Sequence, residues 1–172
     1  LNRNVTWWKE AKSFIEYISR AQHMLIQGLH VADVLGYLGS GVTLFGFLDI
    51  DRGDRPPGYD WDMCNIDVVL HRSSVKNGRI YLPDGKNYAL LALSDHKDIS
   101  LPALQKIEKM VKQGMILVGT PPERASGLTN YPQSDIELKA IVKKLWGEVD
   151  GINTHIIDAF PSPFVENVIN LH

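Results

Sequence analysis

The 172-residue chain has a single cysteine, Cys64, so no disulfide can form within it. It also lacks an excess of charge of either sign, since its formal net charge at pH 7 is −2. This balance gives no reason to expect a nucleic acid or an anionic membrane as partner. Its apolar runs are too short to span a bilayer. The sequence therefore predicts one globular domain, or one domain with part of a neighbour, whose partner is a neutral small molecule or another protein surface.

Several residue patterns that carry catalysis are missing as well. The six histidines do not occur at the spacing that places two metal ligands on one helix face, so no histidine metal centre is expected. The glycines of GYLGSG reverse the order of the dinucleotide-binding fingerprint, which favours a plain loop over a cofactor loop. Cys64 lies inside a predicted helix, near Met63 and Ile66, which favours a buried core residue over a nucleophile.

Carboxylate pairs on rigid elements are also hard to find. Cleavage of a glycosidic bond needs two acids about 5 to 10 Å apart on either side of the bond. The seven glutamates fall instead on polar helix faces, at caps, in loops or in the C-terminal segment: Glu10, Glu16, Glu108, Glu123, Glu137, Glu148 and Glu166. If the chain belongs to a glycosidase, its catalytic acids lie elsewhere, and we assign no catalytic residue here.

What the sequence does contain is an alternation of helical and strand patterns. Apolar residues at three- and four-residue spacing predict an amphipathic helix from Thr6 to Gln27, with Thr6 as its N-cap and Gly28 as a left-handed C-terminal residue. Further helices are predicted over residues 60–72, 100–113 (capped by Ser100 and stopped at Gly114) and 134–146 (opened by a Ser134–Glu137 capping box), and a weaker one over 164–171.

Apolar segments between these helices predict strands at residues 29–38, 88–93 and 115–119, with a weaker one at 154–157. Asn77-Gly78 and Pro83-Asp84-Gly85 are turn signals on either side of RIYL, which predicts a hairpin. Residues 39–58 are rich in glycine and proline and predict a long loop. The alternation predicts an α/β fold with an open, mostly parallel, doubly wound sheet, preceded by one amphipathic helix.

The stretch PPGYDWDMCNID concentrates acidic and aromatic residues and allows three interpretations: a metal loop, a carboxylate pair or a helix start. A calcium loop needs alternating ligands around a glycine turn, but here Gly58 precedes the acids. We therefore predict that Asp60 caps a helix and that Asp62 lies in its first turn, facing the mouth of the sheet. A secondary metal or sugar site at Asp33, Tyr59, Asp60 and Asp62 remains the alternative.

Two long stretches, residues 2–39 and 56–119, resemble the glycoside hydrolases of family 106, the α-L-rhamnosidases and their relatives. The resemblance covers roughly residues 2–146, and its shared elements are RN-x-TWW, YISR, LIQG, VADVL, GYDWD, NGRIYLPDG, YALL and GTPPERASGL. It implies that residues 1–28 are the final helix of an upstream (β/α)₈ barrel, or an N-terminal extension. Residues 29–150 are then a flavodoxin-like domain similar to class I glutamine amidotransferases, and residues 151–172 are poorly matched.

The resemblance also implies a function for the whole enzyme, which is hydrolysis of α-L-rhamnosides in plant or bacterial polysaccharides. The catalytic glutamates and a calcium ion would lie in the barrel, and this chain would hold no cofactor. Asn2, Arg3 and Asn4 match the loop after the last barrel strand, where their side chains can hydrogen-bond sugar hydroxyls. Trp7 or Trp8 would stack on a sugar ring, unless both anchor the helix in the core.

The amidotransferase-like part departs from a working amidotransferase, because MILVG leads into TPPE and not into a nucleophile elbow. We therefore expect a non-catalytic portion of a bacterial glycoside hydrolase that is periplasmic or extracellular. The expected partners are the rest of that enzyme, carbohydrate and, in a homo-oligomer, a second copy, with no nucleic acid and no membrane. The alternatives are a carbohydrate-binding or oligomerisation module and, less favoured, a nucleotide- or flavin-binding domain.

Overall fold

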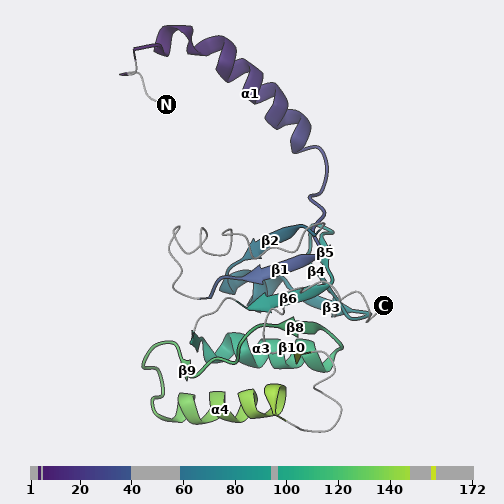
Figure 1. Ribbon diagram of the computed structural model, residues 1–172, viewed down its shortest axis with the longest axis vertical. Coiled ribbons are helices and arrows are strands. Elements are labelled where there is room, and N and C mark those ends of the chain that lie inside the picture. Colours follow the sequence, from purple (N-terminus) through teal and green to yellow (C-terminus); the bar gives the residue numbers. More distant parts are fainter. Residues whose placement is uncertain (1–3, 5, 40–58, 94–96, 148–155, 158–172) are drawn as a thin grey trace. The chain divides into compact units, whose positions relative to one another are not determined.

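The structure is a computed structural model that describes residues 4, 6–39, 59–93, 97–147 and 156–157 (Figure 1). The chain divides into two compact units, Leu1–His30 and Val31–His172. None of the helices in the described ranges combines the length and the apolar character needed to cross a membrane.

The first unit contains a short 3-10 helix, η1 (Trp8–Glu10), and the helix α1 (Ala11–Leu25). The predicted amphipathic helix is therefore present, but both predicted end signals are wrong. The residues before η1 and α1 make no side-chain capping hydrogen bond, so Thr6 does not act as the cap. Gly28 is not among the glycines with positive φ. The C-terminal end is closed instead by the Gln27 side chain, whose Nε2 donates to the His23 carbonyl at 3.0 Å.

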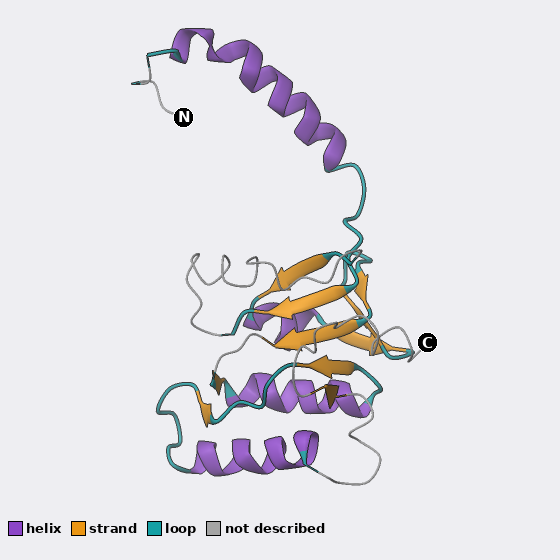
Figure 2. Cartoon of the chain, viewed as in Figure 1, coloured by secondary structure: helices purple, strands orange, loops and turns teal. Residues whose placement is uncertain are grey.

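The second unit is built on a five-stranded sheet of β1 (Val34–Tyr37), β2 (Trp61–Cys64), β6 (Leu90–Leu93), β8 (Ile116–Val118) and β10 (Ile156–Ile157). The strands lie in the order β10-β8-β6-β1-β2, and every neighbouring pair is parallel. Figure 2 shows the arrowheads of β1, β2, β6 and β8 at the same edge of the sheet. Counted along the chain, the five strands have the order 2-1-3-4-5, which confirms the predicted mostly parallel α/β arrangement at this level.

Three helical segments accompany the sheet: a π-helical turn η2 (Val68–Arg72), α3 (Leu101–Lys112) and α4 (Gln133–Trp146). Ser100 caps α3 as predicted, because its side chain accepts from the Ala103 amide, and Gly114 follows the helix with φ +93°. The capping box predicted for α4 is wrong. That helix begins at Gln133 without a side-chain cap, and Ser134 is buried in its first turn.

Two smaller sheets complete the described residues. β3 (Ser74–Lys76), β4 (Arg79–Tyr81) and β5 (Asn87–Tyr88) form an antiparallel sheet, and β7 (Asp98–Ile99) pairs in parallel with β9 (Arg124–Ala125). Asn77 and Gly78 both have positive φ in the β3–β4 turn, as the hairpin prediction requires.

The sheet buries side chains on both faces. Leu35, Tyr37, Leu91, Leu93 and Leu117 belong to one cluster, which also holds all the buried apolar side chains of η2, α3 and α4. On the other face lie Val34, Trp61, Leu90, Ala92, Ile116 and Val118, a cluster to which only strand residues contribute within the described ranges. This burial on both faces explains why the central strands consist of continuous apolar runs.

Two strand predictions need correction. Residues 60–72 are not one helix: β2 occupies Trp61–Cys64, and the chain turns helical only after Asn65. Pairing with β1 decides this, since Val34 lies opposite Trp61 and Tyr37 opposite Cys64. The strand predicted from residue 29 begins only at Val34, because Leu29 and Val31 are exposed. The predicted strand at 154–157 is present in its described part, Ile156–Ile157, whereas the loop at 40–58 and the helix at 164–171 lie outside the described residues.

Candidate functional site

The residues predicted to bind sugar lie at the start of the first unit. Asn2 and Arg3 are outside the described residues, and Asn4 is exposed. Trp7 and Trp8 are 47% and 44% exposed, so about half of each side chain is available to a ligand or to another protein surface. No contact in this chain tests their assignment to a sugar, and it stays a prediction.

Asp33 and Asp60, two members of the predicted secondary site, lie together at the N-terminal ends of β1 and β2. The Asp60 amide donates to Asp33 Oδ2 at 3.3 Å, and the Asp60 carbonyl accepts from the amides of Asp33 and Val34. Asp60 Oδ1 also accepts from the amide of Trp61 at 2.8 Å. These bonds hold the beginnings of two neighbouring strands side by side, with the half-buried Tyr59 just before them in the chain.

This position corrects two predictions at once. Asp60 does not cap a helix, because a strand follows it. The pair also does not face the mouth of the sheet, because ligands of open parallel sheets bind outside the carboxyl ends of the strands, at the opposite edge. The carboxylate Oδ2 of Asp33 and the carboxylate Oδ1 of Asp60 each accept a backbone hydrogen bond, which is a structural role.

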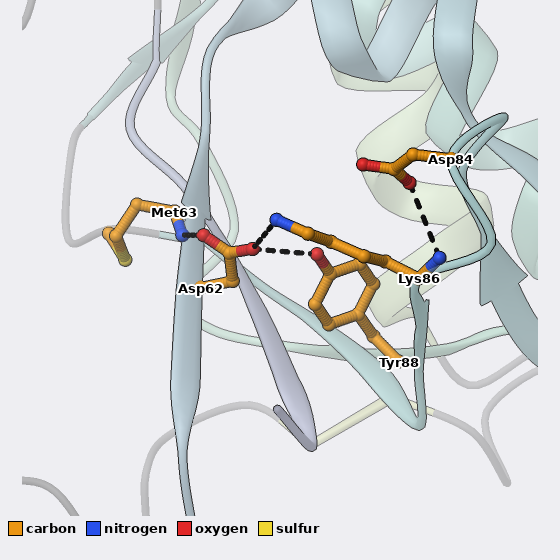
Figure 3. A network of polar contacts seen from close by, with 5 residues as sticks. All are labelled: Asp62, Met63, Asp84, Lys86 and Tyr88. Atoms are coloured by element: carbon orange, nitrogen blue, oxygen red, sulfur yellow. Dashed lines mark hydrogen bonds and ion pairs between the residues drawn. The ribbon is translucent and has the colours of Figure 1, made fainter. Parts of the chain in front are cut away.

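Asp62, two residues after Asp60 on β2, takes part in a different network (Figure 3). Its Oδ2 accepts from Tyr88 Oη at 2.8 Å and from Lys86 Nζ at 3.2 Å, while its Oδ1 accepts from the Met63 amide at 2.9 Å. The Lys86 amide in turn donates to Asp84 Oδ1. Because Asp62 is on the edge strand β2 and Tyr88 is on β5, the network joins the five-stranded sheet to the antiparallel sheet.

The network fixes the protonation of its members. Burial alone would raise the pKa of Asp62, but the hydrogen bonds from Tyr88, Lys86 and the Met63 amide, with the charge of Lys86, outweigh burial and lower it. The pKa of Tyr88 is raised, first by burial and then by the hydrogen bond to Asp62 and its negative charge. Asp62 is therefore a carboxylate at neutral pH and cannot serve as a proton donor, whereas Tyr88 stays protonated and donates to it.

Lys86 and Tyr88 are the residues of this network that the sequence reasoning missed. A signal for them was present, since Lys86 immediately precedes β5 and is two residues before Tyr88, and residues two apart in an extended segment point to the same side. Their partner could not be predicted from the spacing, because Asp62 lies 24 residues before Lys86 in the chain.

Cys64 is the last residue of β2 and not a helix residue, yet the predicted role as a buried core side chain is confirmed. Its side chain belongs to the helix-covered cluster and is 4% exposed. Burial, followed by the negative charge of Asp62, raises the pKa of the Cys64 thiol to about 12. The thiolate needed for nucleophilic attack is therefore scarce at neutral pH.

The acidic residues that the structure describes also do not fit a calcium ion. In the part of the chain that the structure describes, no three side chains of His, Cys, Asp or Glu gather as metal ligands. Both oxygens of Asp62 already accept hydrogen bonds, one of them from an ammonium group that would repel a cation.

Comparison with known proteins places the chain among carbohydrate enzymes. Residues 1–159 match the model of a glycoside hydrolase family, number 106, which is described as alpha-L-rhamnosidase. A putative beta-glucuronidase of Formosa agariphila is 38% identical over 147 residues, which are 86% of this chain and 12% of that protein. A solved structure, a rhamnosidase from Novosphingobium sp. PP1Y, superposes on 99% of this chain with a TM-score of 0.77 and 25% identity, and this chain covers 17% of it. The chain thus spans less than a fifth of either relative.

Proposed function

Because the chain belongs to glycoside hydrolase family 106, we propose that it is the non-catalytic α/β portion of a bacterial enzyme that hydrolyses α-L-rhamnosides. The relatives' names mention two different sugars, glucuronide and rhamnoside, so the choice of rhamnoside rests on the description of the family. The non-catalytic assignment rests on one observation, which is the structural role of the acidic residues. The Asp33 and Asp62 carboxylates accept hydrogen bonds that join separate strand segments, and the Asp60 carboxylate accepts from the adjacent Trp61 amide.

The proposal assigns residues 1–28 to the final helix of an upstream barrel and residues 29–150 to a doubly wound, flavodoxin-like domain similar to class I glutamine amidotransferases. The strand order 2-1-3-4-5 supports the flavodoxin-like assignment, because it is the order typical of that fold. The apolar side of α1 supports the barrel assignment. Phe14, Ile18 and Leu25 recur on one side of the helix and are exposed in this chain, so they are available to pack on a neighbouring surface.

In this proposal the active-site contribution of the chain is confined to the residues before α1. Asn2, Arg3 and Asn4 hydrogen-bond sugar hydroxyls, and Trp7 or Trp8 stacks on a sugar ring. The catalytic acids and a calcium ion belong to the barrel, and the parent enzyme acts in the periplasm or outside the cell. The exposure of both indole rings supports their availability for this role.

The direct test is turnover of an aryl α-L-rhamnoside by the purified 172-residue chain and by the full-length parent enzyme. We expect hydrolysis by the parent only, since the described acids Asp33, Asp60 and Asp62 accept structural hydrogen bonds and are not placed as a pair for glycosidic cleavage. Trp8→Ala in the parent should lower kcat/KM about tenfold, whereas Trp8→Phe, which keeps an aromatic ring, should lower it less. Hydrolysis by the isolated chain at a rate near that of the parent would refute the non-catalytic assignment.

The half-exposed tryptophans also favour a second candidate, a carbohydrate-binding or oligomerisation module. Titration of the isolated chain with rhamnose-containing oligosaccharides distinguishes the two, with tryptophan fluorescence as the readout. Saturable quenching that is lost in a Trp7→Ala, Trp8→Ala variant would support a binding module. If the fluorescence does not change, this would support the interpretation that Trp7 and Trp8 bind sugar only within the parent enzyme.

A further inference from the structure

A hollow opens at the carboxyl edge of the parallel sheet, away from the acidic residues described above. Its lining comes from the end of β1, the end of β6, β7 and the segment after β8: Tyr37, Gly39, Leu93, Asp98, Ile99, Thr120 and Pro122. It measures about 250 Å³, a volume that includes space open to solvent, and its enclosed part is about the size of one water molecule.

The position of this hollow coincides with the point where the strand order of the sheet reverses. In the order 2-1-3-4-5, β1 and β6 are the neighbours from which the chain continues in opposite directions across the sheet. In open α/β sheets, the connections that follow two such strands diverge from each other. Ligands of these sheets bind in the crevice between the two connections. Tyr37 and Leu93, which are directly opposite each other in the β1–β6 register, both line the hollow.

The chemistry of the lining selects among ligand classes. In the described part of the chain none of the seven lining residues is basic, and Asp98 carries a carboxylate, so a phosphate or a carboxylate ligand would be repelled. Asp98 and Thr120 offer hydroxyl-binding oxygens, while Leu93, Ile99 and Pro122 provide an apolar wall. An apolar wall beside a few convergent polar groups is the usual composition of a small-molecule site.

The surrounding structure holds these groups in place. Asp98 is fixed by pairing of β7 with β9 and by Ser126 Oγ, which donates to Asp98 Oδ2 at 2.8 Å. Gly119, just before Thr120, packs so closely on Leu93 that a Cβ there would lie 2.9 Å from the Leu93 Cβ. Trp146 Nε1 donates to the Gly119 carbonyl at 3.1 Å from α4. The residues around the hollow are therefore held by contacts with three elements: β9, β6 and α4.

We propose that this hollow is a binding site for a neutral polyhydroxylated ligand, a monosaccharide or the end of a glycan, that donates a hydroxyl to Asp98. The enclosed part accommodates one hydroxyl group, and the ring of the sugar lies over the open part against the apolar wall. This proposal does not depend on whether the parent enzyme cleaves rhamnosides.

The test uses the 172-residue chain labelled with ¹⁵N and titrated with L-rhamnose, D-glucuronate, inorganic phosphate and adenosine monophosphate. We expect L-rhamnose to shift the amide signals of Gly39, Gly119 and Thr120 and the indole signal of Trp146, with saturation in the millimolar range, about 1 to 20 mM. D-glucuronate, phosphate and the nucleotide should leave these signals unchanged, because each carries a negative charge toward Asp98.

Two variants test the residues and one serves as a matched control. Asp98→Asn keeps the size of the side chain and an acceptor for Ser126 but removes the charge, and it should weaken rhamnose binding about tenfold. Thr120→Val should weaken it by roughly threefold. Asp84→Asn changes an aspartate in the β4–β5 turn and should leave the affinity unchanged. Each variant is compared by urea unfolding, so that a loss of folding is told apart from a loss of the site.

Three outcomes would overturn the proposal. The first is the absence of saturable shifts with L-rhamnose up to about 100 mM, well beyond the expected range. The second is equal affinity of Asp98→Asn and the unchanged chain. The third is binding of phosphate or of the nucleotide at the same signals, which would replace the sugar by an anionic ligand. None of these outcomes bears on rhamnoside turnover by the parent enzyme, so the two proposals fail independently.

Discussion

Asp62 shows how the surroundings of one side chain decide its chemistry. Next to Trp61 and Met63 on an edge strand, it accepts hydrogen bonds from a phenol, an ammonium and a backbone amide. Its ion pair with Lys86 has an Nζ–Oδ2 distance of 3.2 Å and is about a quarter exposed on both sides. The carboxylate is therefore stabilised as an anion and joins two sheets that share no continuous strand.

The first prediction follows from that stabilisation. Asp62→Asn should lower the free energy of unfolding by about 1 kcal/mol at pH 7, a modest value because the pair is partly exposed. The folded-state pKa of Asp62 lies below the unfolded value of about 3.9. Its contribution is thus fully present above pH 4 and is lost as pH falls through the folded pKa. Urea unfolding at pH 7 and at pH 3 measures the difference, which should be smaller at the lower pH.

Asp84→Asn is the control for this experiment, because Asp84 accepts only a 3.3 Å bond from the Lys86 amide at an exposed turn. Its effect should stay within about 0.5 kcal/mol at either pH. If Asp62→Asn were equally destabilising at pH 7 and pH 3, packing and not charge would account for the role of Asp62.

The sequence predicted the site residues unevenly for a physical reason. Cys64 as a buried thiol could be predicted, because its apolar neighbours alone imply burial. The role of Asp62 could not, because its donors come from positions 86 and 88, and only the folded chain brings them together. The hollow at the carboxyl edge was missed likewise, since Tyr37, Asp98 and Thr120 come from three separate segments.

Among the elements, the end of β8 depends on a single residue, Gly119. Gly119 has φ +133°, and a Cβ there would lie 2.9 Å from the Leu93 Cβ and 3.0 Å from the Leu93 carbonyl oxygen. Both the backbone conformation and the approach of β8 to β6 therefore require glycine. Gly127 also has positive φ, +84°, but no atom lies within 4 Å of the corresponding Cβ.

This pair of glycines allows conformational strain to be separated from packing. Gly119→Ala should lower the free energy of unfolding by about 3 kcal/mol, because the backbone strain and the contact with Leu93 both contribute. Gly127→Ala should cost only the strain, about 1 kcal/mol. Thermal and urea unfolding of both variants measure the difference. Equal losses would mean that β8 moves away from Leu93 without cost.

Helix and strand predictions succeeded where local signals were sufficient. Two local residues determine the ends of α3, the cap Ser100 and the following Gly114. The Asn77-Gly78 turn likewise determines the hairpin. The prediction failed at residues 60–72, where the apolar spacing of Met63, Ile66 and Val69 continues from a strand into a helical turn. Only the register with β1 distinguishes the two, and that pairing is tertiary.

At the scale of the whole molecule, the first unit lacks the buried core that the second has. Ala11 is the only described residue of α1 that is buried, and Leu25 is 81% exposed. The opposite side of the helix carries Lys12, Ser13 and Glu16. The apolar stripe of α1, formed by Phe14, Ile18 and Leu25, stabilises a structure only when it packs against another apolar surface. This supports the proposed attachment of α1 to a barrel.

The exposed stripe leads to a prediction for the isolated chain. Phe14→Glu with Leu25→Glu should reduce self-association at high concentration, because exposed apolar surface promotes contacts between copies. The same variant should unfold within about 0.5 kcal/mol of the unchanged chain. In the parent enzyme it should destabilise the protein by at least about 2 kcal/mol, since the stripe is then buried.

Sedimentation velocity measures the association, and urea unfolding measures the stability. Ser13→Glu adds a negative charge on the opposite side of α1 and serves as the control, with no change expected in either protein. If Phe14→Glu with Leu25→Glu left the parent enzyme as stable as before, α1 would not pack through this side.

The strand order has a consequence for biosynthesis. β1 is the first strand of the sheet to leave the ribosome, yet it ends up between β2 and β6, with Val34 opposite both Trp61 and Leu90. At translation rates of about 5 to 20 residues per second, its second neighbour follows only after several seconds. Throughout that interval the nascent chain presents an apolar strand with unpaired edges, so release before residue 93 would leave a fragment prone to aggregation, and chaperones that hold unfolded chains would act during this interval.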